Sequence, residues 1–120
     1  MINDLCNEHA RHPSGERCET CSRIRLERKI VRRVATALIQ AGYAIDLNDG
    51  EETTLRASRD VATILAAAFT TDEDHLIARA PGKPSGIVSL IYGNGNDVIS
   101  DYSVSLEPVL APVNRWTDTL

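Results

Sequence analysis

The sequence is poor in aromatic residues and in long apolar runs. Aromatic side chains make up 4% of the 120 residues, so a buried core must depend on Ile, Val, Leu and Ala. No apolar run approaches the roughly 20 residues that a membrane-spanning helix needs. The first residues, MINDLCNEH, lack a basic start followed by an apolar stretch, and we therefore expect no signal peptide. These absences predict a cytoplasmic protein with no membrane partner.

Combinations of catalytic residues are also missing. The stretch APGKPSG contains a glycine and a lysine but lacks the spacing of a phosphate-binding P-loop. No Ser-His-Asp arrangement can be drawn around His75, and His75 itself is expected to be a surface histidine. Asp97 and Asp101 would share one face of a strand, but nothing places a substrate between them. Because no nucleophile, base and oxyanion donor can be named together, we expect no enzymatic activity.

All three cysteines lie near the N-terminus, in a segment that also holds two histidines. Cys6 and His9 form a C-x-x-H pair, and Cys18 and Cys21 form a C-x-x-C pair. Two such pairs supply the four ligands of a closed, tetrahedral structural zinc site. His12 is an alternative ligand in place of His9. Clustered cysteines in a reducing cytoplasm are more often metal ligands than disulfides, so the sequence predicts one structural Zn²⁺.

A strongly basic segment follows the cysteines. Apolar residues recur there at three- to four-residue steps up to Gly42, which predicts an amphipathic helix that ends at this glycine. On the opposite face only Glu27 offsets a series of cations. These cations are candidates for contact with nucleic acid or another partner, and the alternative is that their stems cover the edge of the core. The candidate residues are Arg23, Arg25, Arg28, Lys29, Arg32 and Arg33.

Charge is unevenly distributed along the chain. Residues 1–40 carry eight Lys or Arg against five Asp or Glu, whereas residues 41–120 carry five against twelve. The front of the chain is therefore positive and the body negative, and partners respond to such local fields. The acidic residues gather around residues 46–52 and 72–74. They are candidates for a surface that occupies a partner's nucleic-acid site, although solubility also explains such clusters.

The rest of the chain alternates between strand and helix patterns. We expect a hairpin over residues 43–55, a helix capped by Ser58, and strands at residues 75–80, 86–92 and 97–103. The strand at residues 86–92 is the most apolar and is expected at the centre of the sheet.

A last helix covers residues 106–120, where Pro112 should kink it or begin a new helix. The predicted fold is α+β, with a mostly antiparallel sheet of about five short strands and three helices. This domain spans residues 23–120, and the zinc-binding arm occupies residues 1–22. Helices are expected on one face of the sheet, and the other face is either solvated or a docking surface.

The C-terminal half contains the stretch IVSLIYGNGNDVISDYSVSLEPVL, with Tyr92-Gly93-Asn94 followed by DVISDYS and then Leu106-Glu107. This stretch resembles the end of small accessory proteins that phages, prophages and plasmids encode. The resemblance covers about residues 34–120 and implies a fold rather than a chemistry, so it assigns no catalytic residues. The cysteine arm separately resembles zinc modules of phage-encoded proteins. Together they imply a protein that acts on host machinery, including nucleic-acid-guided defence complexes, in the manner of anti-CRISPR proteins.

Two functions are compatible with these features. The first is a zinc-stabilised binding protein that docks on a host protein or ribonucleoprotein complex and inhibits a defence system. The second is a nucleic-acid-binding protein or regulator that uses the zinc arm and the basic helix at residues 23–33. The exposed sheet face or the basic helix also offers a surface for a homodimer.

Overall fold

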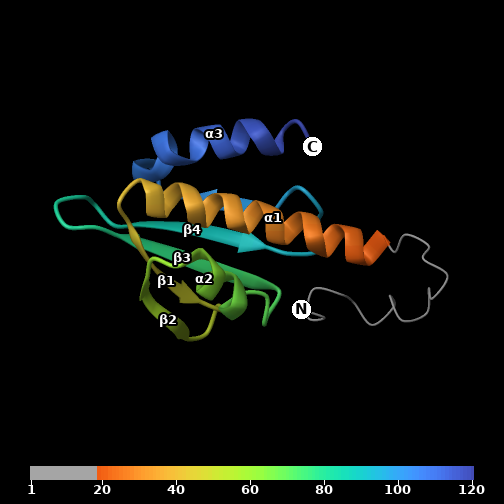
Figure 1. The fold of residues 1–120 in the computed structure, drawn as a ribbon, viewed down its shortest axis with the longest axis horizontal. Helices are drawn as coiled ribbons and strands as arrows, with labels where there is room; N and C mark the ends of the chain where they lie inside the picture. Colours follow the sequence, from red (N-terminus) through yellow and green to blue (C-terminus); the bar gives the residue numbers. More distant parts are fainter. Residues whose placement is uncertain (1–18) are drawn as a thin grey trace.

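The computed structural model describes residues 19–120, and Figure 1 shows their arrangement. The elements are α1 (Glu19–Gln40), β1 (Ala44–Asn48), β2 (Thr53–Ser58), α2 (Val61–Ala67), β3 (Glu73–Arg79), β4 (Gly86–Ile91), β5 (Ile99–Tyr102), the 3₁₀ turn η3 (Val104–Leu106) and α3 (Glu107–Thr117). The predicted α+β class and the predicted order of elements are confirmed. Cys6, His9, His12 and Cys18 lie outside the described residues, so the zinc arm stays a prediction.

The five strands form one antiparallel sheet in the order β2-β1-β3-β4-β5. The centre of the sheet is β3, so the prediction that residues 86–92 form the central strand was wrong. The β1–β2 hairpin pairs with one side of β3, and the β3–β4–β5 meander extends from the other side. Consecutive strands pair as neighbours, which leaves β4 one place from the edge despite its apolar sequence.

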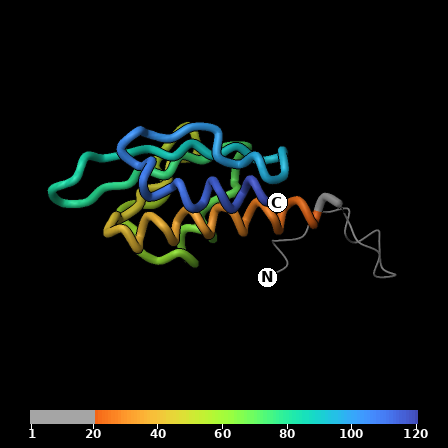
Figure 2. Tube along the Cα trace, turned by 90° about the horizontal axis from the view of Figure 1, so that it is seen from above, coloured from red at the N-terminus to blue at the C-terminus, as the bar shows by residue number. Residues whose placement is uncertain are grey.

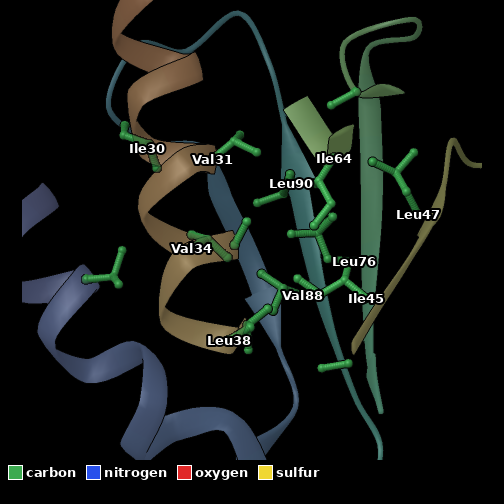
Figure 3. Packing of buried hydrophobic residues seen from close by; sticks show 14 of the residues in the cluster. Ile30, Val31, Val34, Leu38, Ile45, Leu47, Ile64, Leu76, Val88 and Leu90 are labelled. Carbon is green, nitrogen blue, oxygen red and sulfur yellow. The ribbon is translucent and has the colours of Figure 1, made fainter. Parts of the chain in front are cut away.

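The helices cover one face of the sheet. Side chains alternate between the two faces along each strand, and Figure 3 shows Ile45, Leu47, Leu76, Val88 and Leu90 on the covered face. Three residues of α1 point toward them from the other side of the core, Val31, Val34 and Leu38, whereas Ile30 is buried on the side of α1 away from the strands. Within residues 19–120 no helix covers the opposite face of the sheet, and the side chain of Ile87 there is 46% exposed.

The two long helices lie side by side and run in opposite directions (Figure 2). α3 continues through Pro112 as a single helix, so the expected alternative of a new helix start was wrong. Proline removes the hydrogen bond to the carbonyl four residues earlier, here that of Pro108. Both prolines are exposed, so water can satisfy that carbonyl. None of the helices in residues 19–120 combines the length and the apolar character that a membrane crossing requires.

The boundaries of α1 differ from the prediction at one end only. Gly42 ends the helix as expected: with φ at +97° it allows the Tyr43 N–H to donate to the Leu38 carbonyl at 3.1 Å. At the other end the helix begins at Glu19, within the segment of residues 1–22 that was expected to form the zinc arm. Cys21 therefore lies within α1, where it is fully buried.

Two further local predictions were wrong. Ser58 ends β2 instead of capping α2, and Asp60 is the N-cap residue, because β2 extends three residues beyond the expected end near Leu55. Asp97 lies before β5 rather than within it, so Asp97 and Asp101 do not share a strand. The pair therefore offers no shared carboxylate face.

Candidate functional site: the cationic face of α1

The outward face of α1 carries a continuous row of cations. Residues three and four positions apart share a helix face, and this spacing brings together five residues that we call the cation stripe: Arg25, Arg28, Lys29, Arg32 and Arg33. Four of the five side chains are exposed, and Arg28 is half-buried. Their opposite side is the apolar face that packs on the sheet, so core packing fixes the direction in which the stripe points.

The single acidic residue of this segment, Glu27, does not lie on the stripe. Its side chain is 3% exposed and points to the loop between β4 and β5. There Glu27 Oε2 accepts hydrogen bonds from the backbone N–H groups of Gly93 at 2.7 Å and Gly95 at 3.1 Å. The carboxylate is thus bonded within the fold, and it does not neutralise the charge of the stripe.

Arg23, which the sequence also predicted as a contact residue, has a different role from the stripe. Its guanidinium donates to Glu27 Oε1 at 3.1 Å, one helical turn away. Such an i,i+4 pair stabilises a helix modestly. Its charge therefore compensates the buried carboxylate and contributes less to an external field than the five cations of the stripe do.

Aromatic rings contact cations on both sides of the stripe. The Arg33 guanidinium lies 4.2 Å from the ring centroid of Trp116 on α3, and Lys29 Nζ lies 5.7 Å from the same ring. On the other flank, Arg28 lies 5.1 Å from the ring of Phe69. Cation–π contacts leave the charge accessible while they restrict the side chain. These contacts agree with the interpretation that the stems cover the edge of the core, and they leave the charged groups outside, where contact with a partner stays a prediction.

Arg25 and Arg32 of the stripe have no acidic partner in the part of the chain that the structure describes. Neither Arg25 nor Arg32 forms an ion pair with any carboxylate between residues 21 and 120. Together with Arg28 and Lys29 they line a shallow hollow of about 190 Å³. Four cations around one hollow form an arrangement suited to an anion with several oxygens, such as a phosphate.

A buried carboxylate, that of Asp74, lies near the first half of α1. Asp74 is fully buried on β3, where its Oδ2 accepts from the Tyr92 hydroxyl at 2.5 Å and from the Phe69 N–H at 3.0 Å. Its Oδ1 has no partner among the described residues. Burial raises the pKa of Asp74 above the usual aspartate value, and the Tyr92 hydrogen bond only partly opposes this.

The ring of Phe69 connects this carboxylate to the stripe. Phe69 has a φ of +69°, a left-handed conformation that is unusual for a bulky residue. This conformation places its N–H on Asp74 while its ring lies against Tyr92, with centroids 4.5 Å apart, and under Arg28. The Asp74–Tyr92–Phe69 cluster therefore fixes the flank on which Arg28 rests. Sequence reasoning missed this strained position, because no glycine or asparagine marks it.

The two acidic turns meet in space. The Thr71 hydroxyl donates to the Asp49 carbonyl at 2.9 Å, and a Cβ added at Gly50 would lie 3.5 Å from Glu73 Cγ. The two turns therefore form one acidic surface, which consists of Asp49, Glu51, Glu52, Asp72 and Glu73. In the sequence these residues belong to two separate clusters, so the single surface could not be predicted. Asp46 is not part of it, because Asp46 is buried under an ion pair with Arg79 at 3.2 Å.

Of the predicted zinc ligands, the structure describes Cys21 alone. Within residues 19–120 no group of three or more His, Cys, Asp or Glu side chains could hold a metal ion.

His75, expected as an ordinary surface histidine, lies half-buried on β3 between Ser89 Oγ at 3.0 Å and Glu73 Oε2 at 2.8 Å. No protein-family model, no curated protein and no solved structure matches the chain.

Proposed function

We propose that this protein is a binding protein rather than an enzyme, and that its cation stripe binds the phosphate backbone of nucleic acid. The observation that supports this most directly is the position of Glu27. The one carboxylate within the basic segment that could neutralise the stripe is buried against Gly93 and Gly95, while the cations remain outside. A face that only needed solvation would gain from mixed charges, as protein surfaces usually have.

The chemistry of the stripe fits phosphate better than carboxylate-bearing partners of low charge density. Backbone phosphates recur at regular intervals, and a series of arginines on one helix can contact several at once. The aromatic contacts of Arg28 and Arg33 reduce the side-chain entropy that binding would otherwise remove. The acidic surface at the loops would repel a strand lying across it, so the footprint excludes those loops.

The proposal also includes the zinc arm and the cellular setting. One structural Zn²⁺ on Cys6, His9 (or His12), Cys18 and Cys21 would give the segment before α1 a fixed shape next to the stripe. The cysteine usage fits a cytoplasmic protein. The nucleic acid of a host ribonucleoprotein, such as the defence complex that the resemblance to phage-encoded proteins implies, would present the required backbone.

The experiment that tests the function compares two double variants. Arg25→Ala with Arg32→Ala removes the two stripe cations that have neither an acidic partner nor an aromatic contact in residues 21–120, whereas Arg56→Ala with Arg59→Ala removes two exposed cations elsewhere. Both variants have the same net charge. The first should weaken oligonucleotide binding and flatten its salt dependence, and the second should not.

A second candidate function is supported by the meeting of the two acidic turns. Their combined surface could dock on a basic site of a host protein, where nucleic acid normally binds. Glu51→Lys with Glu52→Lys would then release a host complex that the wild-type protein retains, while Arg25→Ala with Arg32→Ala would still retain it. Release by the arginine variant and not by the lysine variant would exclude this candidate.

A further inference from the structure

A groove of about 440 Å³ runs between α1 and α3, next to the cation stripe. Its lining changes character along the helix axis. Lys29, Arg32 and Arg33 line the end nearer the start of α1, and Thr36 and Gln40 lie one to two turns further along. Lys29 and Gln40 are about 16 Å apart along the axis, at 1.5 Å per residue. The groove therefore has a cationic end and a neutral polar end.

The groove is also lined by apolar groups beside its neutral end. Ala37 contributes from α1, and Pro112 and Val113 contribute from α3. Pro112 exposes an apolar ring there and has no N–H group, so this section offers packing surface rather than hydrogen bonds. The volume lies in the range of small-molecule sites, which are mostly apolar with a few placed polar groups.

At the neutral end the polar groups are unused within the fold. The side chains of Thr36 and Gln40 form no hydrogen bond with another side chain or backbone group in residues 19–120. Gln40 carries both a donor and an acceptor, and a carboxamide can pair with the edge of a nucleobase. The lining thus offers groups for a phosphate at one end, and groups for the flat face and the edge of a base at the other.

We propose that this groove holds one unstacked base of a single-stranded nucleic acid whose phosphates lie on the cation stripe. This inference rests on the proposed function and narrows it to single strands, because a duplex keeps its bases stacked inside. Charge complementarity selects this occupant: among the lining residues, all the cations lie at one end and the other end is uncharged. An acidic amphipathic helix, which carries charges along its length, would leave its far end without a partner.

The test uses three oligonucleotides of about 12 nucleotides, a length within the ~4–16-nucleotide site sizes of single-strand binders. They are an oligoadenylate strand, the same backbone without bases, and a duplex containing the oligoadenylate strand. Fluorescence anisotropy gives the affinity of the full chain for each. We expect the base-free strand to bind roughly tenfold more weakly than oligoadenylate, which is a typical loss for one base contact.

Two variants assign this difference to the groove. Thr36→Val with Gln40→Ala should weaken oligoadenylate binding roughly tenfold and leave the base-free strand unaffected. Asn94→Ala, which removes an exposed carboxamide from the β4–β5 loop, serves as the control and should change neither affinity. Ala37→Leu, which fills the apolar section, should reproduce the loss once a thermal melt shows that the variant folds.

Equal affinity for the strands with and without bases would overturn the groove assignment and leave phosphate binding intact. Preference for the duplex would overturn it as well. So would binding of a polyglutamate peptide, added as an acidic alternative to the oligonucleotides, if Gln40→Ala weakened that binding. Absence of binding to all three oligonucleotides would instead refute the proposed function itself.

Discussion

Glu27 Oε2 accepts a hydrogen bond from the backbone N–H of Gly93 at 2.7 Å, across 66 residues of sequence. This contact joins the first half of α1 to the β4–β5 loop and buries the one carboxylate of the basic segment. Gly93 has a φ of +108°, which lets its N–H point at the carboxylate together with that of Gly95. The same contact thus stabilises the fold and keeps this carboxylate from neutralising the cation stripe.

Replacing Glu27 with Ala should lower the free energy of unfolding by roughly 2–3 kcal/mol, because the variant loses charge-assisted hydrogen bonds to two backbone donors. Urea unfolding followed by circular dichroism measures this. Glu51→Ala, at an exposed position of the β1–β2 turn, is the control and should cost less than about 0.5 kcal/mol. Equal effects of the two variants would show that the Glu27 contact does not stabilise the fold.

The cations of the stripe should differ in their effect on stability. Arg33→Ala removes the contact with Trp116 and should cost roughly 1 kcal/mol. Arg25→Ala and Arg32→Ala remove charges that have no acidic partner in residues 21–120, so unfolding free energies should stay within about 0.5 kcal/mol or rise as repulsion falls. Thermal melts at low salt measure all three. A large loss with Arg32→Ala would mean that this residue serves the fold rather than a partner.

Asp74 should make the free energy of unfolding depend on pH with the opposite sign to that of most carboxylates. Burial raises its pKa in the folded state, so the folded protein binds this proton more tightly than the unfolded chain. The contribution of Asp74 to stability is therefore most favourable below its ordinary pKa of 3.8 and declines as the pH rises through the raised value. Asp74→Asn keeps an acceptor for Tyr92 and does not titrate.

The measured quantity is the difference in unfolding free energy between wild type and Asp74→Asn from pH 3 to pH 8. This difference should fall with rising pH. Of the groups that face Asp74, Asp49 raises its pKa further and a protonated His75 would lower it. A parallel series with His75→Gln removes the second effect. A difference that rose with pH would show that the fold stabilises Asp74 as a carboxylate, and a raised pKa would then be wrong.

How far the sequence predicted the structure depends on the kind of interaction. The inner face of α1 and its end at Gly42 followed from local spacing and from glycine chemistry, and both were confirmed. The cap at Ser58 was wrong because strand pairing with β1 extends β2 over that residue. The contacts of Glu27 and Asp74 could not be predicted, since each joins segments whose approach only the folded chain determines.

The zinc prediction requires the full chain and a direct metal analysis. Protein purified without chelators should contain one zinc per chain, and Cys18→Ser should remove it. Cys21→Ser should also remove the metal, but Cys21 is fully buried in α1, so this variant would disturb packing as well. Cys18→Ser is therefore the more informative change. A chain with less than a trace of metal would refute the zinc arm and leave α1 and its stripe unaffected.

The most direct test of the central claim is the salt dependence of binding to the single-stranded oligoadenylate. The logarithm of affinity should fall linearly with the logarithm of salt concentration, with a slope of about −0.7 per phosphate contacted. Arg25→Ala with Arg32→Ala should flatten that slope by about 1.4, which corresponds to two lost contacts, and Arg56→Ala with Arg59→Ala should leave it unchanged. Affinity that is independent of salt, or equal slopes for both double variants, would contradict the assignment of α1 as the phosphate-binding face.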